Sequence, residues 1–225
     1  MIDPGPDVET HVRALSRLIS GAERITILLT HRHSDHAGGA PALARIVDAP
    51  IHAPPSYSPP DGEPVEVEVL REGDRVPTDQ GDLVTLDVPG HSRGHMAFHW
   101  RDGAALFVGD LLLGKGNTTW VGEYLGCVED YLQSLDKVES LGVSVMYPGH
   151  GPPITRPSAA VDLFRRHRLR RLEEVRQVRE RNPGATPEAL AAMIYGGEIP
   201  EKLARAAVDG VRAALYHLDR EYGSS

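Results

Sequence analysis

Four short apolar segments of this 225-residue chain each run directly into histidine or aspartate. The segments cover residues 24–30, 83–88, 104–108 and 143–147, and their β-branched and aliphatic composition predicts strands. Apolar spacing predicts helices over residues 8–19, 41–47 and 128–141, so strands and helices alternate as in an α/β domain. The carboxyl ends of such strands share one edge of the domain, where binding sites form. The residues that follow the four segments are His31, His33, Asp35, His36, His91, Asp110 and His150.

The spacing of these side chains favours a site for two metal ions. His31 and His33 lie two residues apart in an extended segment, so they point the same way and can hold one ion together. Imidazole and carboxylate are ligands that zinc, iron and manganese accept, and paired ions about 3.5–4 Å apart can share one water. We therefore expect a first ligand group (His31, His33 and His91), a second ligand group (Asp35, His36 and His150), and Asp110 as a bridge between them.

The rest of the composition narrows the chemistry of this site. Cys127 is the single cysteine, so no intrachain disulfide can form and the ligands must be histidines and carboxylates. Burial as a small semi-apolar residue is the expected role of Cys127. His95 is expected beside the site rather than as a ligand, and His99 to be structural.

Charge and hydropathy indicate an ordinary cytoplasmic protein. The net charge of −8 provides no general attraction to nucleic acid or to an anionic membrane. No apolar run approaches the ~20 residues that span a bilayer, and the first residues lack the pattern of a signal peptide. We expect no membrane partner.

At the proposed ligands the sequence resembles the metallo-β-lactamase-like superfamily. The segment from Thr30 to Gly39 contains the HxHxDH pattern of that superfamily, and the segments around His91, Asp110 and His150 resemble its later ligand motifs in the same order. Asp110 stands where several true β-lactamases have cysteine, which is typical of the branch with hydroxyacyl-glutathione hydrolases and a lactamase-like endoribonuclease. The resemblance implies an αββα sandwich of α/β class and two divalent metal ions, with zinc favoured over iron or manganese.

Near the N-terminus the chain departs from that pattern. Domains of this superfamily normally begin with several strands before the segment that matches residues 2–5 of this chain. The first sheet is therefore expected to lack N-terminal strands and to have an exposed edge. A homo-oligomer that covers this edge is one expected partner.

The C-terminal part is expected to be a separate appendage. We predict a metallo-β-lactamase-like domain over residues 1–157 and, over 158–225, a basic helix followed by a helical, winged-helix-like unit. Its helices should begin near Thr186 and near Pro200. The basic helix carries eight arginines between Arg165 and Arg181, which favours a solvated, ion-paired face over a phosphate-binding groove. Its apolar positions are Leu163, Phe164, Leu169, Leu172, Val175 and Val178.

Function is expected to be metal-dependent hydrolysis, in which a metal-bound hydroxide attacks an ester or thioester. Asp35 is the predicted catalytic residue, because it can bind the metal and orient the attacking oxygen. A small-molecule or carrier-bound ester is the favoured substrate, with single-stranded RNA as the alternative and a β-lactam as the least favoured. A third hypothesis is a metal-binding fold without turnover.

Overall fold

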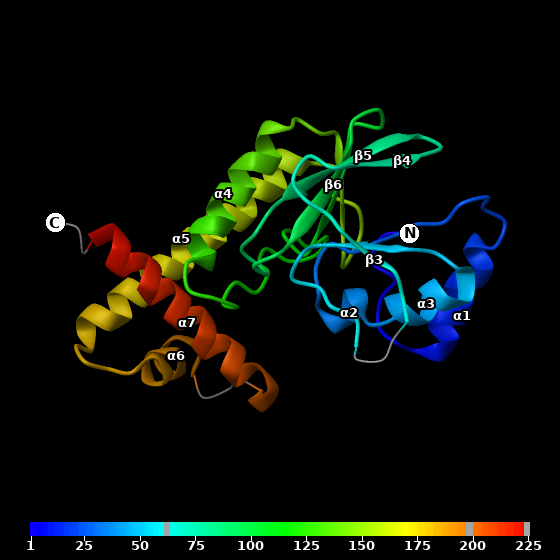
Figure 1. The fold of residues 1–225 in the computed structure, drawn as a ribbon. Coiled ribbons are helices and arrows are strands. Elements are labelled where there is room, and N and C mark those ends of the chain that lie inside the picture. Colours follow the sequence, from blue (N-terminus) through cyan, green and yellow to red (C-terminus); the bar gives the residue numbers. More distant parts are fainter. Residues whose placement is uncertain (61–63, 197–199, 223–225) are drawn as a thin grey trace.

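The computed structural model describes residues 1–60, 64–196 and 200–222 (Figure 1). The helices are α1 (Glu9–Ile19), α2 (Ser34–Ala37), α3 (Ala40–Val47), α4 (Cys127–Ser140), α5 (Pro157–Arg181), α6 (Pro187–Tyr195) and α7 (Glu201–Tyr222). The strands are β1 (Ile27–Leu28), β2 (Ile51–Ala53), β3 (Val67–Val69), β4 (Arg75–Thr78), β5 (Gly81–Asp87), β6 (Met96–Trp100), β7 (Ala105–Gly109) and β8 (Val145–Pro148). None of the described helices is both long and apolar enough to cross a membrane.

Two sheets lie between two layers of helices, which confirms the expected αββα sandwich. The first sheet has the order β1-β2-β3 and is parallel. The second has the order β4-β5-β6-β7-β8 and is antiparallel except for the β7–β8 pair. Helices α1 and α3 cover the outer face of the first sheet, and α4 and α5 cover that of the second (Figure 1).

The alternation of side chains along the strands builds these layers. Ile27 and Leu29 pack with α1 and α3, whereas Leu28 between them packs against the other sheet. In the second sheet Phe98 faces the first sheet, and its neighbour Ala97 faces the helices. Because successive residues of a strand point to opposite faces, each sheet joins two apolar layers.

β1 is much shorter than the predicted strand over residues 24–30. The chain stays buried up to Thr30, where it bends and its backbone N–H donates to the carboxylate of Asp3 (2.8 Å). A side chain thus replaces a neighbouring strand, and the chain leaves the sheet at His31. The strand ends where the metal-ligand segment begins.

Ile2 lies at the edge of the first sheet. It forms a parallel bridge with Leu28, on the side of β1 that does not pair with β2. Among the described residues, no other segment pairs with Ile2 at this edge, and Ile2 itself forms an isolated bridge and not a strand. Coverage of this edge by a second copy stays a prediction.

The C-terminal residues form the helices α5, α6 and α7, and the described part of this region contains no strand. Their buried side chains Phe164, Leu172 and Val211 belong to the same apolar cluster as Leu106 in β7 and Leu135 in α4. The core is therefore continuous across residue 157. The division into two domains and the winged-helix likeness both stay predictions.

Candidate metal centre

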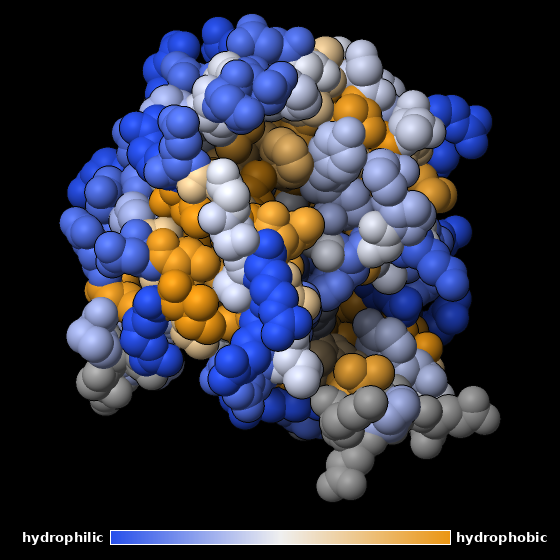
Figure 2. Space-filling model, turned by 90° about the vertical axis from the view of Figure 1, so that its right-hand side faces the viewer, coloured by the Kyte–Doolittle hydropathy of each residue, from blue (hydrophilic) through white to orange (hydrophobic). Residues whose placement is uncertain are grey.

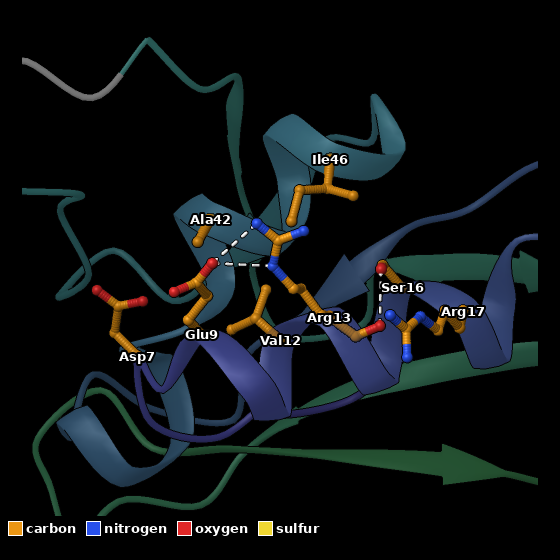
Figure 3. Close-up of a pocket in the computed structure, with 8 residues that line it drawn as sticks. All are labelled: Asp7, Glu9, Val12, Arg13, Ser16, Arg17, Ala42 and Ile46. Atoms are coloured by element: carbon orange, nitrogen blue, oxygen red, sulfur yellow. Dashed lines mark hydrogen bonds and ion pairs between the residues drawn. The ribbon is translucent and has the colours of Figure 1, made fainter.

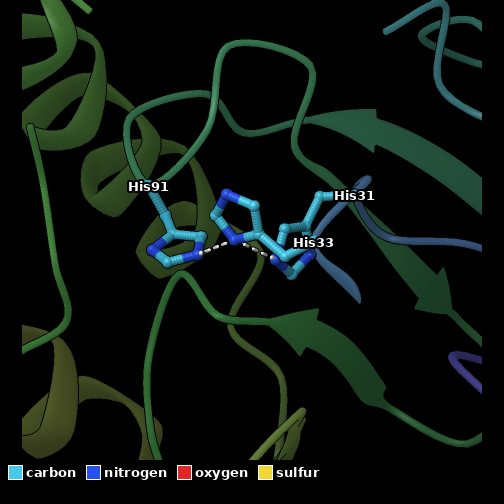
Figure 4. Close-up of side chains that lie close together, drawn as sticks. All are labelled: His31, His33 and His91. Carbon is cyan, nitrogen blue, oxygen red and sulfur yellow. Dashed lines mark hydrogen bonds between the residues drawn. The ribbon is translucent and has the colours of Figure 1, made fainter. Parts of the chain in front are cut away.

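The side chains of the first ligand group converge from two loops (Figure 4). His31 and His33 follow β1, and His91 follows β5. The Nδ1 atom of His33 lies 3.0 Å from Nε2 of His31 and 3.0 Å from Nε2 of His91. Ligands at ~2.0–2.1 Å from one tetrahedral zinc ion would be roughly 3.3 Å apart, so this spacing fits a common ion.

The second ligand group adjoins the first. The Nε2 atom of His150, which follows β8, lies 3.1 Å from Nε2 of His36 and 3.1 Å from Oδ2 of Asp35. Asp35 and His36 are in the first turn and last turn of the four-residue helix α2. The donor atoms of the three residues all lie within 4.8 Å of one another.

Asp110 lies between the two groups. Its Oδ2 is 3.8 Å from Nε2 of His91 and 3.6 Å from Nε2 of His150. Its Oδ1 is 3.4 Å from Nε2 of His36, is buried and has no hydrogen-bond partner among the described residues. A buried carboxylate oxygen without a hydrogen bond, surrounded by imidazole nitrogens, is an environment that suits a cation.

Space for this arrangement requires glycine at two positions. A Cβ at Gly149 would lie 2.4 Å from Cε1 of His36 and 2.8 Å from Oδ1 of Asp110. Gly109 has a φ of +49°, and a Cβ there would lie 2.7 Å from the Thr30 hydroxyl. Any side chain at either glycine would displace a group of the site.

Asp3 contacts both ligand groups on the side away from the proposed ions. The sequence analysis did not assign it a role. Its Oδ2 accepts from the Thr30 hydroxyl (2.6 Å) and lies 2.9 Å from Nδ1 of His36. Since the Thr30 hydroxyl proton goes to Asp3, the hydroxyl oxygen accepts from Nδ1 of His31 (2.9 Å). Both rings then carry their proton on Nδ1, which leaves Nε2 as the metal ligand. The only signal in the sequence was an aspartate next to Pro4 and Gly5, and its contact with Thr30, 27 residues away, exists only in the folded chain.

His91 has its own outer partners. Its Nδ1 donates to the backbone carbonyl of Trp120 (2.9 Å) and lies 3.2 Å from the Thr119 hydroxyl. Its Nε2 therefore also faces the site as the free donor atom. A backbone carbonyl leaves no mark in the sequence, so this contact could not be foreseen.

The pKa of His36 shifts in the opposite direction from those of His31 and His91. For His36, burial lowers the pKa, but interactions with Asp110 and Asp3 outweigh it and raise the pKa to about 10. For His31 and His91, burial and the neighbouring histidines lower the pKa below its usual range. For Asp110, the histidines, His36 foremost, overcome the effect of burial and lower the pKa. The site thus keeps Asp110 ionised and holds His31 and His91 neutral, as metal ligation needs, whereas His36 must lose its proton before it binds an ion.

His95 lies behind the ligands, as expected. It is fully buried, its ring centre is 4.9 Å from that of His31, and its Nε2 accepts from the backbone N–H of Asp110 (3.0 Å). That hydrogen bond occupies the nitrogen nearest the site. His95 therefore supports the loop that carries Asp110.

The arginine-rich helix α5 is mostly ion-paired in the structure. Arg165 contacts Asp136 and Glu139 of α4, and Arg168 is buried. The other paired arginines are Arg166 with Asp162, Arg171 with Glu174, Arg176 with Glu173 and Glu180, and Arg179 with Asp219. This pattern matches the solvated, ion-paired face favoured from the sequence.

A separate hollow of about 290 Å³ lies between α1 and α3 on the face shown in Figure 2. Hydrophobic and hydrophilic side chains are mixed over this face. Ile46, which is exposed, lines the hollow. Figure 3 shows that Arg13 is bound to Glu9 at the hollow. None of its lining residues belongs to either ligand group, so it has no part in the metal centre.

A sandwich whose strand ends bring histidines and aspartates into two adjoining groups defines a metal-binding α/β protein. Comparison with known families matches residues 1–150 to the family described as Metallo-beta-lactamase superfamily. The chain belongs to that superfamily.

Three relatives show the range of names within the match. A Caenorhabditis elegans protein named beta-lactamase-like protein 2 homolog is 28% identical over 98% of this chain and 75% of its own length. Atrochrysone carboxyl ACP thioesterase of Aspergillus fumigatus is 34% identical over 76% of this chain, which spans only 56% of that protein. A hydroxyacylglutathione hydrolase of Fuscovulum blasticum is 42% identical over 45% of this chain and 40% of its own length.

Solved structures support the fold. A beta-lactamase domain protein from Burkholderia ambifaria has a TM-score of 0.86 and 22% identity, covering 98% of this chain and 76% of its own. A structure described as a di-iron-bound form has a TM-score of 0.54 and 31% identity, covering 73% of this chain and 85% of its own.

Proposed function

We propose that this chain is a metal-dependent hydrolase of an ester or thioester. The observation that carries the proposal is the convergence of the first and second ligand groups on the two sides of Asp110. A pair of divalent ions bound there would supply activated water and stabilise the oxyanion that forms on the substrate. Water would add to the carbonyl carbon, the bond to sulfur or oxygen would break, and the leaving group would depart as a thiol or an alcohol.

Asp35 has the exposure that its proposed catalytic role needs. Its side chain is 56% exposed, whereas that of Asp110 is 10% exposed, so only Asp35 faces both the second ligand group and the solvent. We assign to Asp35 the orientation of the attacking water, and to Asp110 the bridge between the ions. Glu123, at 3.6 Å from Nε2 of His33 and bound to Arg32, fixes the rim on the other side.

Names of relatives favour the thioester. Two of the three relatives are named as hydrolases of thioester or related substrates, a carrier-protein thioesterase and a hydroxyacylglutathione hydrolase. For the ions, the histidine and carboxylate donors suit zinc, iron or manganese. Zinc is our first proposal, and the di-iron-bound relative supports iron as the alternative.

Single-stranded RNA remains the alternative substrate, with less support. A phosphate-binding groove needs cations that are free to contact phosphates. Five of the eight arginines of α5 already pair with acidic side chains, and Arg168 is buried. A fold without turnover is the outcome to be excluded by assay.

The test is hydrolysis by the purified, metal-loaded protein of a panel of acyl thioesters, single-stranded RNA and a β-lactam. We expect thioester cleavage that Asp35→Ala abolishes and that Asp79→Asn, a change at an exposed turn, leaves intact. Faster cleavage of RNA than of any thioester, also lost in Asp35→Ala, would reverse the substrate order. Protein that holds two ions yet cleaves nothing in the panel would contradict the proposal.

A further inference from the structure

One charged side chain of α5 is buried without an acidic partner. Arg168 is 7% exposed, and no carboxylate of the described residues forms an ion pair with it. Its Nη2 donates to the backbone carbonyl of Thr119 (3.0 Å), and its guanidinium lies 5.5 Å from the ring centre of Tyr131. Burial lowers the pKa of Arg168. A buried cation without a counter-charge is costly to the fold.

The carbonyl that Arg168 binds belongs to the loop that holds His91. Thr119 and Trp120 together provide the two atoms nearest to Nδ1 of His91. The same loop is bound from α7, where the indole N–H of Trp120 donates to the carbonyl of Ala206 (3.0 Å). Two C-terminal helices thus fix one loop, and that loop fixes the orientation and the tautomer of one proposed ligand.

We propose that Arg168 is a positioning residue for the first ligand group, acting through the Thr119 carbonyl on His91. The inference rests on the proposed metal centre. Arg168 lies beyond residue 150, outside the part of the chain that matches the family. The C-terminal helices therefore contribute to metal binding at the first ligand group. The second ligand group forms no hydrogen bond or ion pair with this loop in the described part of the chain, so it is independent of Arg168.

Two variant backgrounds allow Co²⁺ binding at each ligand group to be measured separately. His150→Ala removes a donor from the second ligand group and leaves the first to bind Co²⁺, and His91→Ala does the reverse. Arg168→Met is added to each, and Co²⁺ affinity is measured by competition with a chromophoric chelator, together with the visible spectrum of the bound Co²⁺. Arg170→Met, at an exposed arginine of the same helix, is the matched control.

We expect Arg168→Met to weaken Co²⁺ binding by about tenfold to a hundredfold in the His150→Ala background and to change the Co²⁺ spectrum, because outer partners of ligands have effects of this size. In the His91→Ala background the loss should be under about twofold, since the group through which Arg168 acts is gone. Arg170→Met should change neither the Co²⁺ affinity nor the Co²⁺ spectrum. An equal loss of Co²⁺ affinity in both backgrounds, or no loss in the His150→Ala background, would overturn the proposal.

Arg168→Lys provides a second route if Arg168→Met does not fold. Lysine keeps the charge but not the planar guanidinium, so the variant should fold and weaken Co²⁺ binding by less than about tenfold, again only where His91 is present. Unchanged Co²⁺ affinity in folded Arg168→Lys, with Arg168→Met unfolded, would overturn the proposal as well. These measurements need no turnover, so an enzyme that binds ions but hydrolyses nothing would contradict the proposed function and leave this inference standing.

Discussion

The two ligand groups share Asp110 but differ in their surroundings. In the first, His31 is fully buried, His91 is 5% exposed, and the outer nitrogen of each ring is bound by a hydroxyl or a carbonyl. In the second, the side chains of Asp35 and His150 are 56% and 49% exposed. A group whose rings are already fixed loses less conformational freedom when it binds an ion. We therefore expect the first group to hold its ion more tightly, and the second to be the side that substrate reaches.

The largest effect should come from removing the residue common to both groups. Asp110→Ala leaves neither ion its bridging oxygen, and we expect turnover to fall at least about a thousandfold, equivalent to about 4 kcal/mol. Metal analysis of the purified variant should show fewer than two ions per chain. Retention of two ions with ordinary turnover would show that Asp110 does not bridge.

Variants of one group at a time test the predicted difference directly. His150→Ala should lose the second ion and keep the first. His91→Ala should bind both ions less tightly than the wild type, because an ion at the first group holds Asp110, the ligand that lies between the two groups, in place. Isothermal titration with Zn²⁺ would give the two affinities. A wild-type protein with equal affinities, or with the weaker ion at the first group, would break the comparison.

Asp3→Asn should have an intermediate effect on both groups. Asparagine keeps the size but loses the charge that binds His36 and the Thr30 hydroxyl. Loss of an outer carboxylate partner typically lowers metal affinity by about 10- to 100-fold. The matched control is Asp7→Asn, an exposed aspartate without a role in the site. An effect confined to one group would show that Asp3 does not connect the two.

The smallest effect concerns acidity in the metal-free protein. Burial lowers the pKa of His31, His91 and His95, so the unfolded state takes up protons below its pKa of 6.5 that the folded state does not, and stability is lost as the pH falls. His36, with a raised pKa of about 10, offsets one of these losses and itself loses its stabilising effect as the pH rises from 6.5 towards 10. From pH 7 to pH 6 we expect a net loss of about 1 kcal/mol, or a fall of about 2–4 °C in the thermal midpoint. A constant or rising midpoint in that range would contradict these pKa shifts.

The alternation of strands and helices was sufficient to predict an α/β domain, and the resemblance to a known superfamily implied the sandwich. The structure brings together all seven proposed ligands because they follow apolar strands whose ends share an edge. The residues that hold these ligands in place were harder to predict from the sequence. Asp3 and Thr119 act across 33 and 28 residues on His36 and His91, through contacts that only the folded chain creates.

Helix α5 shows the same limit. Its arginines were interpreted as one solvated face, yet Arg168 is buried while Leu163 and Leu169, assigned to the apolar face, are 40% and 47% exposed. The available signal was that Arg168 stands four residues after Phe164 and four before Leu172, on the stripe that faces the core. The many arginines of the helix favoured a solvent-exposed role for all of them, although the position of Arg168 indicated burial.

The contacts within the two groups also differ in how far apart their residues lie along the chain. His33 and His91 are separated by 58 residues, whereas His36 and His150 are separated by 114. Closing a loop of twice the length costs only about 0.6 kcal/mol more in chain entropy, so stability hardly distinguishes them. The order in which the ligands are synthesised does distinguish them. The three ligands of the first group are present once residue 91 has been made, although their support from Trp120 and Arg168 follows later. The second group forms only after β8 has paired with β7. During synthesis, the first group therefore has all its donor atoms before the second does, but it reaches its full affinity only after the C-terminal helices have packed.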